Sequence, residues 1–117
     1  MIILISSEGE NIESQPCTRF GRTPYFIKYN LDDNSWEPIQ NKATMESGGA
    51  GVAASQLLID HKVSAALSGR FGPNAHRALS SAGIQMFTFD GSYQSVQNVI
   101  EGFKNKQLKE ARGMGGF

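Results

Sequence analysis

Residues 63–89 read VSAALSGRFGPNAHRALSSAGIQMFTF, and this stretch decides the fold class. Two apolar segments, Val63–Leu67 and Ile84–Phe89, have the length and composition of buried strands. Between them a helical pattern begins at Pro73, a residue suited to the first position of a helix, and ends at Gly83. A strand, a helix and a second strand in this order predict a right-handed parallel crossover. The chain is therefore expected to be an α/β protein.

Three more strands are predicted before this unit. Ile2–Ile5 is an apolar, β-branched run typical of a strand buried on both faces. Tyr25–Leu31 and Trp36–Ile39 flank a polar turn and predict a hairpin, which requires at least one antiparallel strand. We expect a mixed five-stranded sheet with strand order 3-2-1-4-5, in which only the second strand runs antiparallel.

Two further helices complete the pattern. One follows Gly48–Gly51 and carries Ala50, Ala53, Ala54, Leu57, Leu58 and His61 on a single face. The other has Val96, Val99, Ile100 and Phe103 on its apolar face, with Asp90 or Ser92 as candidate N-cap. Helices on both faces of the sheet predict a three-layer α/β/α architecture.

Length and composition define one domain in the cytoplasm. The chain has 117 residues, a single-domain length, and we expect residues 1–108 to fold and 109–117, which are polar and then glycine-rich, to form a disordered tail. One cysteine cannot form an internal disulfide, which fits a reducing compartment. Eleven basic and eleven acidic residues give no positive field for nucleic acid. No segment has the pattern of a signal peptide or of a membrane span.

Three groups of residues together resemble a known family. They are Phe20-Gly21-Arg22 with Phe26; Asn41 ahead of Gly48-Gly49-Ala50-Gly51; and Ser68-Gly69 with Gly72-Pro73-Asn74-Ala75, Leu79 and Gly83-Ile84. In this order and spacing, over residues 1–108, they resemble the dinitrogenase iron–molybdenum cofactor biosynthesis family, the small NifX-like domains. The chain departs from the family pattern at Arg19, where members often have a histidine, and in a tail without histidine or cysteine.

The resemblance carries expectations about fold and function. It implies a ribonuclease-H-like fold and a non-catalytic carrier or scaffold for an iron–sulfur or iron–molybdenum type cluster. The implied partners are proteins that donate or accept the cluster, and the chain itself is expected to be a monomer or a weak homodimer.

The candidate site lies where parallel strands end, the edge at which α/β sheets bind ligands. Three segments are expected to meet there: the loop of residues 6–22, the helix start at Gly48–Gly51, and the turn of residues 69–76. Backbone N–H groups of Gly48, Gly49 and Gly51 would approach an anion at a helix N-terminus. The alternative is that these glycines serve tight turns only.

Four side chains are candidate ligand contacts. Cys17 is a candidate thiolate ligand for iron whose pKa Arg19 and Arg22, nearby in sequence, would lower, or else a free loop cysteine. His76, in the first turn of its helix, is a candidate metal ligand or a solvated residue. Arg22 and Arg70 are candidates for pairing with an anionic ligand.

Each candidate has a structural alternative or a limit. A salt bridge or a loop-carbonyl contact is the alternative for Arg22. His61 is interpreted as a packed or capping residue at the far end of its helix. One cysteine cannot hold a four-cysteine cluster, so a bound cluster would be preformed and held largely by other contacts.

Enzyme activity is not expected. A nuclease of this fold requires several carboxylates around two metal ions, but the first strand has none and the fifth has only Asp90 at its end. The sequence contains no phosphate loop ending in Gly-Lys-Ser/Thr and no nucleophile elbow. Two hypotheses remain: a cluster carrier, or a module that binds a small anion or a protein partner without a metal cluster.

Overall fold

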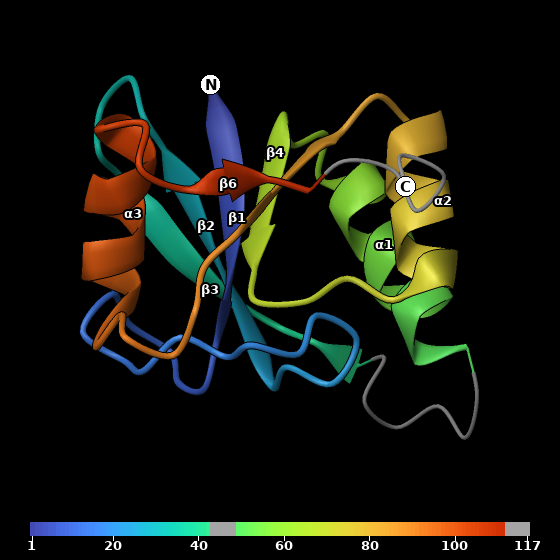
Figure 1. The fold of residues 1–117 in the computed structure, drawn as a ribbon, viewed down its shortest axis with the longest axis horizontal. Coiled ribbons are helices and arrows are strands. Elements are labelled where there is room, and N and C mark those ends of the chain that lie inside the picture. Colours follow the sequence, from blue (N-terminus) through green and yellow to red (C-terminus); the bar gives the residue numbers. More distant parts are fainter. Residues whose placement is uncertain (43–48, 112–117) are drawn as a thin grey trace.

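The computed structural model describes residues 1–42 and 49–111, which form one sheet with helices on both faces (Figure 1). In chain order the elements are β1 (Ile2–Ser7), β2 (Tyr25–Asn30), β3 (Trp36–Gln40), α1 (Ala50–Asp60), β4 (Ala65–Ser68), α2 (Pro73–Ser81), β5 (Gln85–Thr88), α3 (Val96–Lys104) and β6 (Lys109–Glu110). The first eight elements follow the predicted order.

The sheet in these residues has six strands in the order β3-β2-β1-β4-β5-β6. β1, β4 and β5 are parallel, whereas β2 runs antiparallel to both β1 and β3. The predicted order 3-2-1-4-5 is therefore present, but the prediction of five strands with a single antiparallel one is wrong. β6 adds a sixth strand, antiparallel to β5, and consists of residues that the sequence assigned to the tail. Residues 112–117 of that tail lie outside the described residues.

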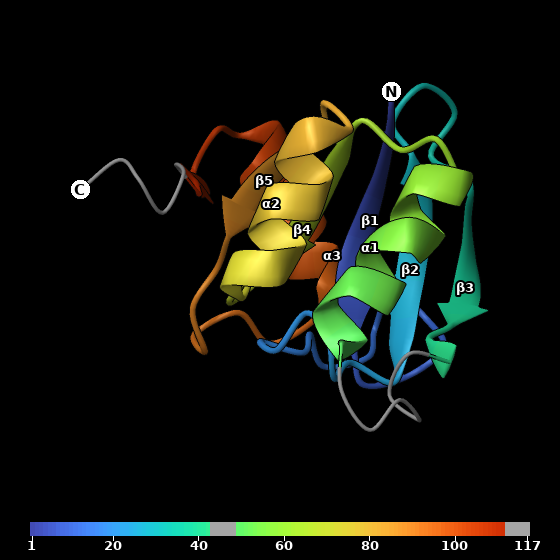
Figure 2. The same ribbon diagram turned by 90° about the vertical axis from the view of Figure 1, so that its right-hand side faces the viewer.

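The three layers follow from the alternation of apolar side chains along β1. Leu4 packs in the core under α1 and α2, with Leu58 and Leu79. Ile3 and Ile5 face the other core, under α3, because successive side chains of a strand point to opposite faces. Figure 2 shows α1 and α2 side by side on one face of the sheet, with α3 behind it.

The helices begin in two different ways. Ser95 caps α3, and its hydroxyl accepts a hydrogen bond from the Asn98 amide at 3.1 Å. The prediction of Asp90 or Ser92 as this cap is wrong, because the Asp90 carboxylate accepts the Ser92 amide in a turn of its own. By contrast, α1 and α2 begin at glycines with no side-chain cap. Within residues 1–42 and 49–111, no helix has the length and hydrophobicity needed to cross a membrane.

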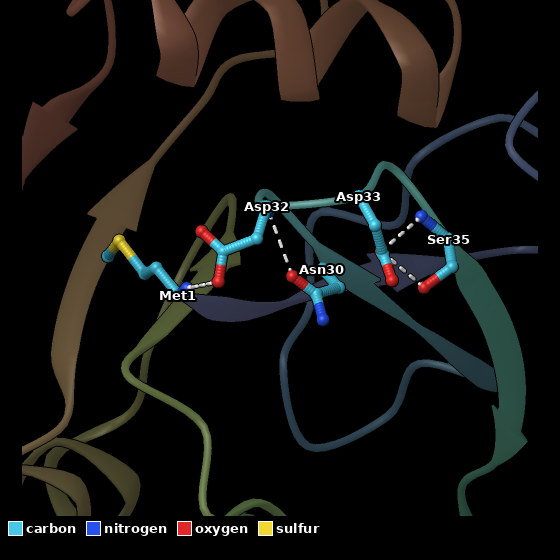
Figure 3. A network of polar contacts seen from close by, with 5 residues as sticks. All are labelled: Met1, Asn30, Asp32, Asp33 and Ser35. Carbon is cyan, nitrogen blue, oxygen red and sulfur yellow. Dashed lines mark hydrogen bonds and ion pairs between the residues drawn. The ribbon is translucent and has the colours of Figure 1, made fainter.

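The turn between β2 and β3 lies beside the start of β1 and is held by a network of polar contacts (Figure 3). Asn30 accepts the Asp32 amide at 2.8 Å, and the Met1 amine lies 3.1 Å from the Asp32 carboxylate. Asp33 accepts both the amide and the hydroxyl of Ser35, at 2.9 and 2.7 Å. Side chains that bond to nearby backbone groups fix such turns, so this end of the hairpin is well defined.

Candidate functional site

The carboxyl edge of the sheet, where β1, β4 and β5 end, brings together the three segments named from the sequence (Figure 2). We call residues 17–22, 49–51 and 69–76 the carboxyl-edge site. The loop meets α1 at Gly21, where a side-chain carbon would lie 3.1 Å from the Gly51 amide nitrogen. α1 in turn meets α2, because a side-chain carbon on Gly51 would lie 3.4 Å from the Ala75 methyl. Glycine at position 21 therefore permits the close approach of the loop to α1, whereas a side-chain carbon on Gly51 would make only an ordinary contact with α2.

The same loop is fixed to the turn between β4 and α2. A side-chain carbon on Gly69 would lie 2.6 Å from Cβ of Thr18, so only glycine fits there. The Phe20 amide donates to the Arg70 carbonyl at 3.2 Å, and Arg19 forms a parallel bridge with Arg70. The residues of the family resemblance thus have a structural role in holding the segments together.

Aromatic packing and one buried side-chain amide hold the loop of residues 17–22 in place. The ring of Phe20 lies 5.4 Å from that of Phe26 and 5.0 Å from that of Phe71. Asn41 is buried, and its side-chain amide donates to the Thr23 carbonyl at 2.8 Å. These contacts account for the spacing of Phe20, Phe26 and Asn41 in the sequence.

The starts of α1 and α2 form the most distinctive feature of the site. Their N-caps are Gly49, with φ of 70°, and Gly72. Neither helix has a side-chain cap or an acidic residue in its first turn. The first N–H groups of a helix lack internal partners and carry about half a positive charge through the helix dipole. Two such ends lie side by side here, which is a favourable arrangement for an anion.

Both candidate arginines belong to the meeting segments. Arg22 follows Gly21 in the loop, and Arg70 precedes Phe71 in the turn. Both are exposed. Of the glycines named from the sequence, Gly49 and Gly51 lie at the start of α1, whereas Gly48 falls outside the described residues.

Cys17 is buried rather than presented to solvent. Its exposed fraction is 3%, its amide donates to the Ser6 carbonyl at 3.0 Å, and its thiol donates to the Arg19 carbonyl at 3.7 Å. Burial raises the pKa of the Cys17 thiol, and this effect outweighs the hydrogen bonds that lower it. The prediction that nearby arginines lower this pKa is wrong, because proximity in sequence does not offset desolvation.

His76 is the last residue of the carboxyl-edge site and lines a cavity beside α2. Its Nδ1 lies 3.4 Å from the Ser80 hydroxyl, and its ring lines a space of about 370 Å³ between α2, β5 and β6, together with Met86 and Glu110. Cys17 is not among the residues lining this space. In residues 1–42 and 49–111, no three histidine, cysteine or acidic side chains gather as a metal site. His61 is the C-cap residue of α1, in agreement with its interpretation as a capping residue.

Two buried hydroxyl groups were missed by sequence reasoning. Ile5 pairs with Leu67 in parallel register, so the next residues, Ser6 and Ser68, are neighbours at the ends of β1 and β4. By alternation they share the face of Leu4, under α1 and α2. Both are fully buried, and neither hydroxyl has a hydrogen-bond partner among the described residues. Each serine directly follows an apolar run, Ile2–Ile5 or Ala65–Leu67, and this position is the signal in the sequence that points to it.

The fold defines a small α/β protein in which two uncapped helix starts lie at the carboxyl edge of the sheet, and comparison with known proteins identifies its family. The family model described as dinitrogenase iron-molybdenum cofactor matches residues 1–106, so the chain belongs to this family. No curated protein matches the chain.

Two solved structures are similar over nearly their whole length. The apo form of the orange protein from Desulfovibrio gigas is 29% identical with a TM-score of 0.90, covering 96% of this chain and 93% of that one. A protein from Thermotoga described as a candidate NifB protein is also 29% identical, with a TM-score of 0.81 and coverages of 93% and 91%. The family resemblance seen in the sequence is confirmed.

Proposed function

We propose that the protein is a non-catalytic carrier or scaffold whose cargo is an anionic iron–sulfur or iron–molybdenum type cluster. The observation that carries this proposal is the pair of uncapped helix starts, Gly49 and Gly72, side by side at the carboxyl edge. Membership of the iron–molybdenum cofactor family supplies the class of cargo. The description of the orange protein structure as an apo form implies a ligand for that relative, which supports a ligand here.

The chemistry of the site favours a preformed cargo held without a full set of protein ligands. The chain has one cysteine, whereas iron–sulfur clusters are ordinarily held by four. That cysteine is buried, with a raised pKa, and so is held as a neutral thiol. The N–H groups of Gly51 and its neighbours, with the guanidinium groups of Arg22 and Arg70, instead offer donors and positive charge to cluster sulfides.

The carrier role requires that cargo can enter and leave. Gly49, Gly72, Arg22 and Arg70 are all exposed, so a donor or acceptor protein in the cytoplasm can reach the site directly. In this account the protein performs no bond-making step; it binds, shields and releases. Whether it works as a monomer or a weak homodimer does not alter this scheme.

One observation favours a second candidate function. The site offers hydrogen-bond donors and positive charge, and Cys17 is buried and is not among the residues that line the cavity beside His76. Such a site suits a small oxyanion as well as a cluster. The second candidate is therefore a module that binds a small anion or a protein partner without metal.

An anaerobic titration separates the two candidates. The purified chain is mixed with a synthetic [4Fe–4S] thiolate cluster or with isolated iron–molybdenum cofactor, desalted, and assayed for iron, molybdenum and sulfide. The carrier proposal predicts retention near one cluster per chain and at least a threefold loss of affinity in Arg70→Gln. Retention of neither cluster contradicts it, and sulfate binding by calorimetry in that case supports the second candidate.

Two variants test the proposed ligands Cys17 and His76. A tenfold loss of cluster affinity in Cys17→Ala, about 1.4 kcal/mol, would show that the thiol becomes a ligand on loading. The same loss in His76→Ala would show that the imidazole does so. Unchanged affinity in both variants, with His61→Ala as a control, excludes the two residues as ligands and leaves the anion-binding edge as the whole site.

A further inference from the structure

A second cavity, distinct from the one beside His76, lies on the α3 face of the sheet. It is bounded by the end of α3, by β5 and by the turn after β2. Its volume is about 410 Å³, within the range of small-molecule sites. The walls are apolar and the mouth is basic; the lining residues are Leu31, Phe87, Phe103, Lys104, Lys106 and Leu108. None of these residues belongs to the carboxyl-edge site, so the cavity requires an explanation of its own.

The apolar walls are held in place before any ligand arrives. The rings of Phe87 and Phe103 meet edge to face, with centroids 5.0 Å apart. Leu108 packs on α3 at Gly102, where a side-chain carbon would lie 3.4 Å from its methyl group. Leu31 adjoins the turn fixed by the polar network of Figure 3. Because these side chains are already ordered, little conformational entropy is lost when a ligand binds in the cavity.

Two lysines place positive charge at the mouth. Lys104 donates to the Asn34 side chain at 3.1 Å and lies 5.3 Å above the ring centroid of Tyr29. Lys106 has a φ of 59°, a left-handed conformation that a residue other than glycine or asparagine adopts at a cost. The helix dipole favours a lysine in the last turn of α3. The helix dipole accounts for the position of Lys104, but it does not account for an apolar cavity next to two lysines. The residues that line this cavity include no acidic side chain that would neutralise them.

We infer that this cavity binds an amphipathic carboxylate, with an aromatic or short aliphatic body between Phe87, Phe103 and Leu31 and the carboxylate at Lys104 and Lys106. The apolar walls favour the body by burial. The two ammonium groups favour an anion over a neutral or cationic analogue of the same shape. This site is independent of cargo at the carboxyl edge, and cargo-free protein has it as well.

Calorimetry with 2-naphthoate and its neutral amide tests the inference. The chain is expected to bind one naphthoate and to prefer it over 2-naphthamide by at least about fivefold at low salt. The double variant Lys104→Gln, Lys106→Gln should lose this preference while binding the amide as before. Lys62→Gln is the matched control, because Lys62 is also left-handed, with φ of 56°, but does not line the cavity.

A cavity-filling variant locates the site. Leu31→Trp should abolish binding of both compounds while circular dichroism and the melting temperature show an intact fold. If that variant fails to fold, naphthoate-induced amide shifts at Phe87, Phe103 and Leu108 of the parent chain decide the location. No naphthoate binding at millimolar concentration, equal binding of acid and amide, or shifts confined to other residues would each overturn the inference.

Discussion

Replacing Asn74 with aspartate changes one charge at the start of α2 and almost nothing else. Asn74 is the second residue of the helix, directly after Pro73, and is exposed. Aspartate has nearly the same shape as asparagine. No acidic residue occupies the first turn of α2 in the parent chain. The variant therefore separates the electrostatics of this helix start from its packing.

The two expected effects have opposite signs. A carboxylate near a helix N-terminus stabilises the helix by about 0.3–1 kcal/mol. In a domain of this size that raises the melting temperature by about 1–4 °C. The same carboxylate repels a bound anion. At a separation of about 7 Å and an effective dielectric constant of about 40–80, the repulsion is about 0.6–1.2 kcal/mol per unit charge of the cargo.

The assay combines a thermal melt of cargo-free protein with the anaerobic cluster titration. Asn74→Asp should melt higher and bind cluster about threefold to sevenfold more weakly per unit charge. The loss should shrink at high salt, because exposed charges are screened. Asn98→Asp is the matched control: it makes the same change in the first turn of α3, on the other face of the sheet. It should affect cluster binding less than about twofold.

Two outcomes would refute this reasoning. Unchanged cluster affinity in Asn74→Asp, together with the higher melting temperature, would show that cargo does not lie at the start of α2. An equal loss in Asn74→Asp and Asn98→Asp would show that only the net charge of the protein matters.

Three further predictions concern the surroundings of the site. Gly69→Ala should lower the free energy of unfolding by about 1–3 kcal/mol in urea titrations, because the new methyl group would overlap Thr18. Gly91→Ala is the control: its surroundings are open, so it should change the free energy of unfolding by less than about 0.5 kcal/mol, and equal effects of the two variants would contradict this packing. In the unfolded chain Cys17 loses its proton near the ordinary thiol pKa of 9.0, whereas the buried thiol keeps it, so this group's contribution to the free energy of unfolding should be complete below pH 9 and decline above it. The decline of the free energy of unfolding should be weaker in Cys17→Ala, and identical pH profiles of the two proteins would count against the raised pKa. Ser68→Ala should raise the free energy of unfolding of cargo-free protein by about 1 kcal/mol in a thermal melt, because it removes a buried hydroxyl that has no hydrogen-bond partner among the described residues. A clear loss of stability in that melt would show that the hydroxyl already has a partner.

The order of the elements could be predicted because hydrophobic periodicity is strong in most of them. The run Ile2–Ile5 is buried on both faces and lies in the middle of the sheet, as its composition indicates. β6 could not be predicted in this way. Lys109 and Glu110 are polar and exposed, and β6 is held by backbone pairing with β5 rather than by apolar side chains. The ribonuclease-H-like assignment stays a prediction.

The meeting of the three segments could also be predicted, but the surroundings of single side chains could not. Strand direction places the loop, the start of α1 and the turn before α2 at one edge, and the structure has them there. Burial of Cys17 depends on how its loop folds back on β1, which sequence spacing does not reveal. His76 directly follows the buried Ala75, and one residue turns a helix by about 100°, so its ring does not share the face of Ala75. The ring is instead half-buried, and its Nε2 atom is buried without a hydrogen-bond partner among the described residues.

Mapping the bound cluster on the backbone amides tests the central claim most directly. Nitrogen-15-labelled protein is loaded anaerobically with a synthetic [4Fe–4S] thiolate cluster, and its amide spectrum is compared with that of cargo-free protein. The account predicts that the free amides at the starts of α1 and α2, Ala50–Val52 and Asn74–Ala75, shift or broaden most, together with those near Arg70. Changes confined to other parts of the chain, or none at all, would contradict a cargo site at the carboxyl edge.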